Sequence, residues 1–152
     1  MRKVLIGLVL LCLATTACSP AALFKPRIAL EELSFDVAPG ANEDTVVALE
    51  LVAVNDEYLL NHLGTLTAAQ WFDPQANFRR DYPASLRIWR YELPPNSRLQ
   101  LPQPLPFAHQ PGRGLLLFAN YRTPGAHRLR LDAYNKAIVV FGPSAISVQA
   151  LP

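Results

Sequence analysis

The sequence predicts a mainly β protein, folded as a two-sheet antiparallel β-sandwich with one or two short helices inserted after the second strand. About seven or eight short segments have strand character, and turn residues separate them roughly every eight to twelve positions. Six of the 14 prolines lie in residues 94–111, where they disfavour helix interiors. Several strands are apolar on one face only, which favours two packed sheets over the alternative, a closed barrel.

Residues 1–17 have the layout of a signal peptide. Arg2 and Lys3 precede an apolar run, residues 4–14, and small side chains follow that run. The run is about a dozen residues long, whereas a membrane-spanning helix needs roughly 20. We therefore expect residues 1–17 to be removed on export rather than to remain as a transmembrane anchor.

Cys18 directly follows this segment and is the predicted site of lipid attachment. Thr16, Ala17 and Cys18 resemble the lipobox of bacterial lipoproteins, although Thr15 stands where a Leu is commoner. The sequence has two cysteines, and the other one lies inside the signal. A thioether-linked diacylglycerol and a further acyl chain would anchor the protein stably. The alternative is a secreted protein in which this cysteine is incidental. No cofactor is expected besides the covalent lipid at Cys18.

The predicted organisation is a lipidated tether, residues 18–27, followed by a β-sandwich domain, residues 28–152. In Gram-negative lipoproteins the residue after the lipidated cysteine directs sorting, and Asp there favours the inner membrane. Ser19 stands there instead, which implies a lipid anchor at the periplasmic face of the outer membrane. Without Arg2 and Lys3 the 14 basic residues fall to 12, which equals the 12 acidic ones. This balance argues against a nucleic-acid partner.

The first half of the domain contains two strand signals and the helical segment. Residues 28–37 alternate between apolar and polar side chains, as a half-buried strand does. A turn-rich loop leads to residues 46–54, which are apolar on both faces apart from Glu50 and are therefore expected in the centre of a sheet. Residues 55–72 should form two short helices, the first capped by Asn55 and the second begun by a capping box. Residues 73–85 are expected to be a polar linker.

Strand signals fill the rest of the chain, separated by Pro, Gly and Asn turns. The segment at residues 114–121 is nearly continuously apolar, which is typical of a buried strand. The proline-rich stretch at residues 102–106 is either a polyproline ligand for a partner or, in the favoured interpretation, a stiff connector. The remaining predicted strands are residues 86–91, 98–101, 127–133, 137–141 and 145–150.

No catalytic or metal-binding pattern is visible, so we expect no enzymatic activity. His62, His109 and His127 have no other His, Cys or acid pair at metal-ligand spacing and are expected to be surface or cap residues. There is no nucleophile elbow and no glycine-rich phosphate loop.

The order of these elements resembles the TssJ family of type VI secretion lipoproteins. Members have a lipobox and tether, a strand ending in an Asn-containing loop, a Val-rich strand and short helices rich in Leu and aromatic residues. A strand pair joined by a Pro-Asn turn and a buried strand ending in an aromatic-Arg pair follow, here Tyr121 and Arg122. The family's Asn-Pro-Asp in the first loop and its Trp after the aromatic-Arg pair are absent, as in a divergent member.

The resemblance implies a transthyretin-like sandwich with added helices and a non-enzymatic role in assembly. It implies that the protein is anchored in the outer membrane by its lipid and binds the periplasmic part of a large inner-membrane secretion subunit. It also implies a partner-binding loop after the first strand, which here consists of Ala41, Asn42, Glu43, Asp44 and Thr45. No small-molecule substrate is expected.

A second hypothesis is a periplasmic ligand- or carbohydrate-binding lipoprotein. It would use Trp71, Trp89 and Tyr91 as an aromatic platform. Rings aligned in an open cleft would favour this hypothesis, whereas rings buried between the sheets would favour the secretion role.

Overall fold

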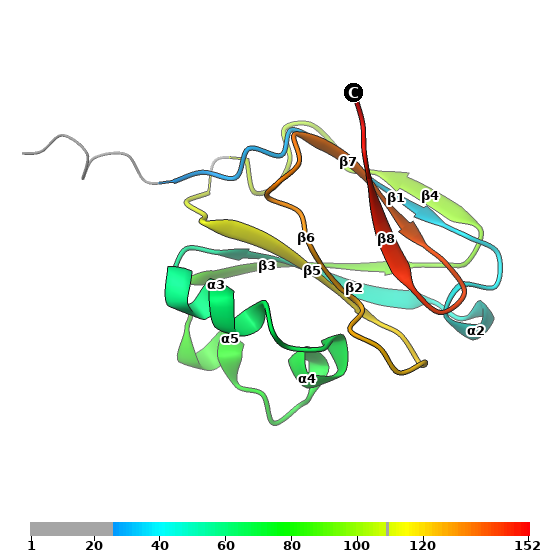
Figure 1. Ribbon diagram of the computed structural model, residues 1–152, viewed down its shortest axis with the longest axis horizontal. Helices are drawn as coiled ribbons and strands as arrows, with labels where there is room; N and C mark the ends of the chain where they lie inside the picture. The colour runs from blue at the N-terminus through cyan, green and yellow to red at the C-terminus, as the bar shows by residue number, and fades with distance from the viewer. Residues whose placement is uncertain (1–25, 109) are drawn as a thin grey trace, which may run out of the picture.

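Two four-stranded sheets pack against each other in the computed structural model, which describes residues 26–108 and 110–152 (Figure 1). The fold class predicted from the sequence is confirmed. The first sheet has the order β4-β1-β7-β8 and the second has the order β3-β2-β5-β6. The strands of the first sheet are β1 (Glu32–Val37), β4 (Ser97–Gln100), β7 (Lys136–Phe141) and β8 (Ile146–Ala150). Those of the second are β2 (Val47–Val54), β3 (Leu86–Leu93), β5 (Gly114–Asn120) and β6 (Arg128–Arg130).

The strands pair antiparallel, with one exception. β1 and β7 run parallel over six residue pairs, from Glu32 opposite Lys136 to Val37 opposite Phe141. β2 occupies the inside of its sheet, as its two apolar faces predict, and pairs with β3 on one side and β5 on the other. The central strand therefore fixes the register of three strands at once.

The core lies between the sheets and draws on both of them. Leu33 and Phe35 of β1 meet Leu49 and Leu51 of β2, and all four side chains are at most 1% exposed. Burying a side chain of this size contributes about 1.5–3 kcal/mol. The proline-rich stretch belongs to the connection between β4 and β5, in which Leu105 and Phe107 are fully buried. The connector interpretation of that stretch therefore agrees with its packing.

Three short helices, α3 (Glu57–Leu63), α4 (Ala68–Phe72) and α5 (Phe78–Asp81), cover the outer face of the second sheet (Figure 1). Asp56, rather than the expected Asn55, caps α3, because its carboxylate accepts a hydrogen bond from the backbone N–H of Leu59 at 2.7 Å. The predicted capping box begins α4. A separate apolar cluster from the helices, β2 and β5 fills this second layer.

Two further local expectations were wrong. The segment at residues 73–85 contains α5 instead of being only a polar linker. The strand expected at residues 127–133 is restricted to β6, because His127 has a φ of 41° and the backbone turns after Leu131. The predicted signal, most of the tether, Cys18, Ser19 and His109 lie outside the described residues. Within the described residues, no helix has the length and apolar character needed to cross a membrane.

Candidate functional site

The predicted partner-binding loop folds as an unusual left-handed turn, α2 (Ala41–Asp44). Asn42, Glu43 and Asp44 have φ values of 52°, 58° and 57°, and Gly40 before them has 73°. Left-handed backbone costs L-residues roughly 1–2 kcal/mol each, and it persists only where the surroundings enforce it. Three such residues in succession indicate that this loop is held in shape rather than free to relax.

The Asn42 side chain holds the loop in this conformation, and its hydrogen bonds are called the clamp below. It is 3% exposed, and its Nδ2 donates to the Thr45 hydroxyl at 2.9 Å and to the Val46 carbonyl at 3.1 Å. Its Oδ1 accepts from the Arg122 backbone N–H at 2.7 Å, and its own backbone N–H donates to the Pro143 carbonyl at 3.1 Å. The loop is thereby bound to the end of β5 and to the β7–β8 turn.

This clamp divides the five predicted loop residues into two groups. Ala41 and Asn42 are buried, whereas Glu43 and Asp44 are exposed and Thr45 is half-buried. Beside them, Val46 is 50% exposed, and Thr45 and Val46 line a shallow hollow of about 410 Å³. Arg122 lines the same hollow and pairs with Glu43 at 3.9 Å. The exposed part of the loop, with its neighbours Val46 and Arg122, thus offers two carboxylates, one guanidinium and an apolar side chain.

An aromatic pair supports this end of the sandwich. The rings of Tyr121 and His127 stack with centroids 4.6 Å apart, and the Tyr121 hydroxyl donates to the Gly142 carbonyl at 2.8 Å. Burial raises the pKa of Tyr121 to about 12. His127 was expected to be a surface or cap residue; it is 8% exposed, so the surface alternative is wrong, and its Nε2 lies 2.8 Å from the Thr123 carbonyl oxygen. His62 is exposed on α3.

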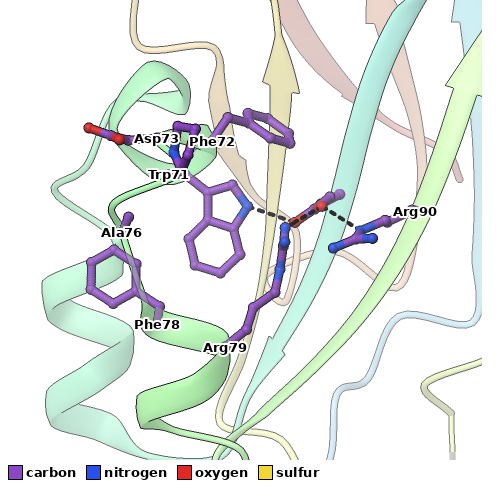
Figure 2. A pocket seen from close by; sticks show the side chains of 9 residues that line it. Trp71, Phe72, Asp73, Ala76, Phe78, Arg79 and Arg90 are labelled. Atoms are coloured by element: carbon purple, nitrogen blue, oxygen red, sulfur yellow. Dashed lines mark hydrogen bonds and ion pairs between the residues drawn. The ribbon is translucent and has the colours of Figure 1, made fainter.

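A second cluster, which the sequence reasoning missed, surrounds the buried Glu50 (Figure 2). The carboxylate of Glu50 accepts hydrogen bonds from Trp71 Nε1 at 2.8 Å, from Arg90 Nε at 2.8 Å and from Arg79 Nη2. Its side chain is 5% exposed, so the surrounding donors take the place of water. The signal in the sequence was a single carboxylate within an otherwise apolar strand.

Stacked rings extend this cluster. Trp71 lies between Phe118 of β5, at 4.8 Å, and Phe78 of α5, at 5.8 Å, and both rings are nearly parallel to it. The Arg79 guanidinium carbon is 5.8 Å from the indole centroid. A hollow of about 240 Å³ opens beside these groups (Figure 2). Since every partner of Glu50 donates to it, the cluster fastens α4 and α5 to the sheet rather than offering a free base.

The three rings of the carbohydrate hypothesis do not form one platform. Trp71 is 4% exposed and lies in the outer layer beneath the helices. Trp89 and Tyr91 pack against the core between the sheets, where they contact Phe107 and Phe35. The rings therefore lie on opposite faces of the second sheet, which argues against a common stacking surface.

Among residues 26–108 and 110–152, no three His, Cys, Asp or Glu side chains gather as a metal site would require. The loop clamp and the Glu50 cluster are each built around a buried polar side chain. They lie on different parts of the second sheet. The clamp joins the start of β2 to the end of β5, whereas Glu50 lies in the middle of β2.

Comparison with known proteins identifies the fold. No family model matches the sequence, and no curated protein matches it. Among solved structures, the type VI secretion lipoprotein TssJ1 from Pseudomonas aeruginosa is 19% identical, with a TM-score of 0.62 over 80% of this chain and 95% of that chain. A chain of the TssM C-terminal domain structure from EAEC is 10% identical, with a TM-score of 0.59 over 78% and 99% of the two chains.

Lip from Serratia marcescens, a membrane-bound component of the type VI secretion system, is 13% identical, with a TM-score of 0.56 over 78% of this chain and 96% of that chain. The chain therefore has the fold of the type VI secretion lipoproteins, and the family resemblance seen in the sequence is confirmed at the level of fold. Nearly the full length of each of these chains takes part in the match.

Proposed function

We propose that this chain is an outer-membrane-anchored lipoprotein that serves as a structural and assembly component of a type VI secretion membrane complex. In this role it binds the periplasmic part of an inner-membrane subunit and performs no catalysis. A lipid on Cys18 moors it to the periplasmic face of the outer membrane, and Ser19 permits sorting there. The observation that carries the proposal is the match of nearly the whole domain to secretion lipoproteins, together with a cysteine at the end of a signal-like segment.

The loop geometry supports a contact role for Glu43, Asp44 and Thr45. A partner gains most from a surface that is already ordered, because it then spends little binding energy on fixing the loop. The buried Asn42 supplies that order, and the hollow beside Val46 gives an apolar anchor for an incoming side chain. The proposal therefore places the contact on the exposed half of the loop and gives the buried half a supporting role.

The anchor is tested with Cys18→Ser in the full chain. A serine hydroxyl cannot form the thioether, so this variant should leave the membrane fraction, remain folded and fail to support secretion. Ser19→Asp is the matched variant, because it keeps the lipid but should move the protein to the inner membrane. Membrane fractionation of Cys18→Ser identical to that of the parent protein would refute the anchoring role, as would mass spectrometry that finds a bare thiol at residue 18.

The same preparations test the proposed contact between the loop and the inner-membrane subunit. Glu43→Arg with Asp44→Arg reverses two exposed charges and should abolish co-purification with the inner-membrane subunit, while the membrane fraction stays unchanged. Glu31→Arg with Glu57→Arg also reverses two exposed charges, away from the loop, so it is the charge-matched control and should have no effect. Equal loss of co-purification in both variants would argue against a contact at the loop.

A further inference from the structure

The edge of the second sheet at β3 is open. β3 pairs with β2 over all eight of its residues and ends the sheet on that side. In the described part of the chain, the backbone groups of residues 87–92 form no hydrogen bonds beyond those with β2. A strand edge with unpaired N–H and C=O groups is a ready template for one more strand.

A groove follows this edge. A hollow of about 450 Å³ is lined by Ile88, Trp89, Arg90 and Tyr91 of β3 and by Arg79 of α5. Trp89 and Tyr91 pack toward the core between the sheets, whereas Ile88 packs toward the outer layer. Because neighbouring side chains of a strand point to opposite faces, a hollow that takes in both sets runs across the exposed backbone itself.

The groove is basic, and its charges are held in place. Arg79 and Arg90 each bind the buried Glu50, while their side chains remain 44% and 66% exposed. The two guanidiniums outweigh the one carboxylate of Glu50 behind them, and the five residues that line the hollow include no acid. A second copy of β3 would bring like charges together here, so the edge favours an acidic occupant.

We propose that the open edge of β3 binds an extended, acidic segment of a partner protein as an added strand. Carboxylates on one face of that segment pair with Arg79 and Arg90, and apolar side chains on its other face contact Trp89 and Tyr91. The segment recognised therefore alternates between acidic and apolar residues. This surface is separate from the loop at residues 41–45, and the proposal does not depend on the secretion role.

The test uses the full lipidated protein in detergent micelles and a seven-residue peptide of alternating glutamate and valine. N-methylation along one edge of the peptide prevents it from pairing with itself. Calorimetry should detect binding that weakens with salt, and hydrogen-exchange mass spectrometry should show slower exchange in residues 86–93 but not in residues 97–100. A peptide with lysine in place of glutamate should not bind, and neither should one that is N-methylated along both edges.

Arg90→Gln should weaken binding of the glutamate peptide about fivefold, the effect of losing one partly exposed charge pair. Arg98→Gln is the matched control, because Arg98 is an exposed arginine on β4, the edge strand of the other sheet. Binding of the lysine peptide, or protection that spares residues 86–93, would overturn the proposal. Protection of residues 86–93 that grows with protein concentration alone would assign the edge to a second copy and would overturn it as well.

Discussion

At the scale of single residues, Glu50 shows how one buried carboxylate organises a surface. It lies in the middle of an apolar strand, and its donors come from α4, α5 and β3. Those donors are 21, 29 and 40 residues away in the sequence. The carboxylate therefore ties three separate segments to one point, and its replacement should loosen all of them together.

Glu50→Gln should lower the free energy of unfolding by about 1–2 kcal/mol. The amide keeps the size of the side chain but loses the charge, and it directs an N–H group at donors. The loss is moderate because both arginines are partly exposed and can regain water. Urea denaturation measures it. Glu57→Gln, which breaks an exposed pair with Arg113 at 3.3 Å, should change the free energy by less than about 0.5 kcal/mol. Equal effects of the two variants would contradict the role of burial.

Tyr121 makes the free energy of unfolding depend on pH in the alkaline range. Its pKa rises from 10.0 in the unfolded chain to about 12 in the fold, so the folded state binds the phenolic proton more tightly. Its stabilising contribution is present below pH 10 and is lost as the pH rises from 10 toward 12. Tyr121→Phe should flatten the fall in unfolding free energy across this range, whereas Tyr58→Phe, at a side chain that is 84% exposed, should leave it unchanged. Urea titrations at successive pH values measure both.

At the scale of elements, the left-handed backbone of α2 fixes the shape of the loop but lowers the free energy of unfolding. Asp44 has a φ of 57° and an exposed side chain. Asp44→Gly should therefore raise the free energy of unfolding by up to about 1 kcal/mol, because glycine adopts this backbone without a steric cost. Gln75→Gly, at an exposed position outside the positive-φ region, should lower it instead. Thermal unfolding of both variants decides the matter, and stabilisation by neither would show that the turn is unstrained.

Alternation and apolar runs predicted most of the strands correctly, because each depends on neighbours within the same segment. α5 escaped prediction because its single turn has no apolar period of its own. The stack of Phe78 on Trp71 and the bond from Arg79 to Glu50 hold it in place. The parallel pairing of β1 with β7 was not predicted either. Alternation along a strand indicates which face is buried, but it does not indicate the direction of the neighbouring strand.

The loop was located by resemblance, but its division into a buried and an exposed half was not. That division follows from Asn42, whose amide contacts Arg122, 80 residues away. A lone asparagine in a turn-rich loop is ordinarily an exposed turn former, and nothing nearby in the sequence distinguishes a clamp from such a residue. The Glu50 cluster and the clamp are both assembled from distant segments, which explains why local patterns predicted the fold better than the sites.

At the scale of the whole molecule, the start of the domain and the loop lie at opposite ends of the sandwich (Figure 1). The Gly112 backbone N–H donates to the Pro26 carbonyl at 3.0 Å, and that of Arg113 donates to the Val54 carbonyl at 2.7 Å, so the domain begins beside the end of β2. The loop precedes the start of the same strand, and eight residues of strand separate the two ends by about 23 Å. A lipid at Cys18 is at most about 29 Å of extended chain from Pro26.

Because the tether and the loop lie at opposite ends of the sandwich, a lipid-anchored domain should hold the loop away from the bilayer. If Cys18 carries lipid, a cysteine introduced at Ala84 or Glu43 is the only free thiol and can be labelled with a donor fluorophore. Ala84 is exposed just before β3, at the end nearer the tether, and Glu43 is exposed at the far end. In vesicles with acceptor-labelled headgroups, energy transfer should be higher from Ala84→Cys than from Glu43→Cys. Equal transfer would mean that the tether lets the domain lie in any orientation, and the loop would then not be directed toward a partner across the periplasm.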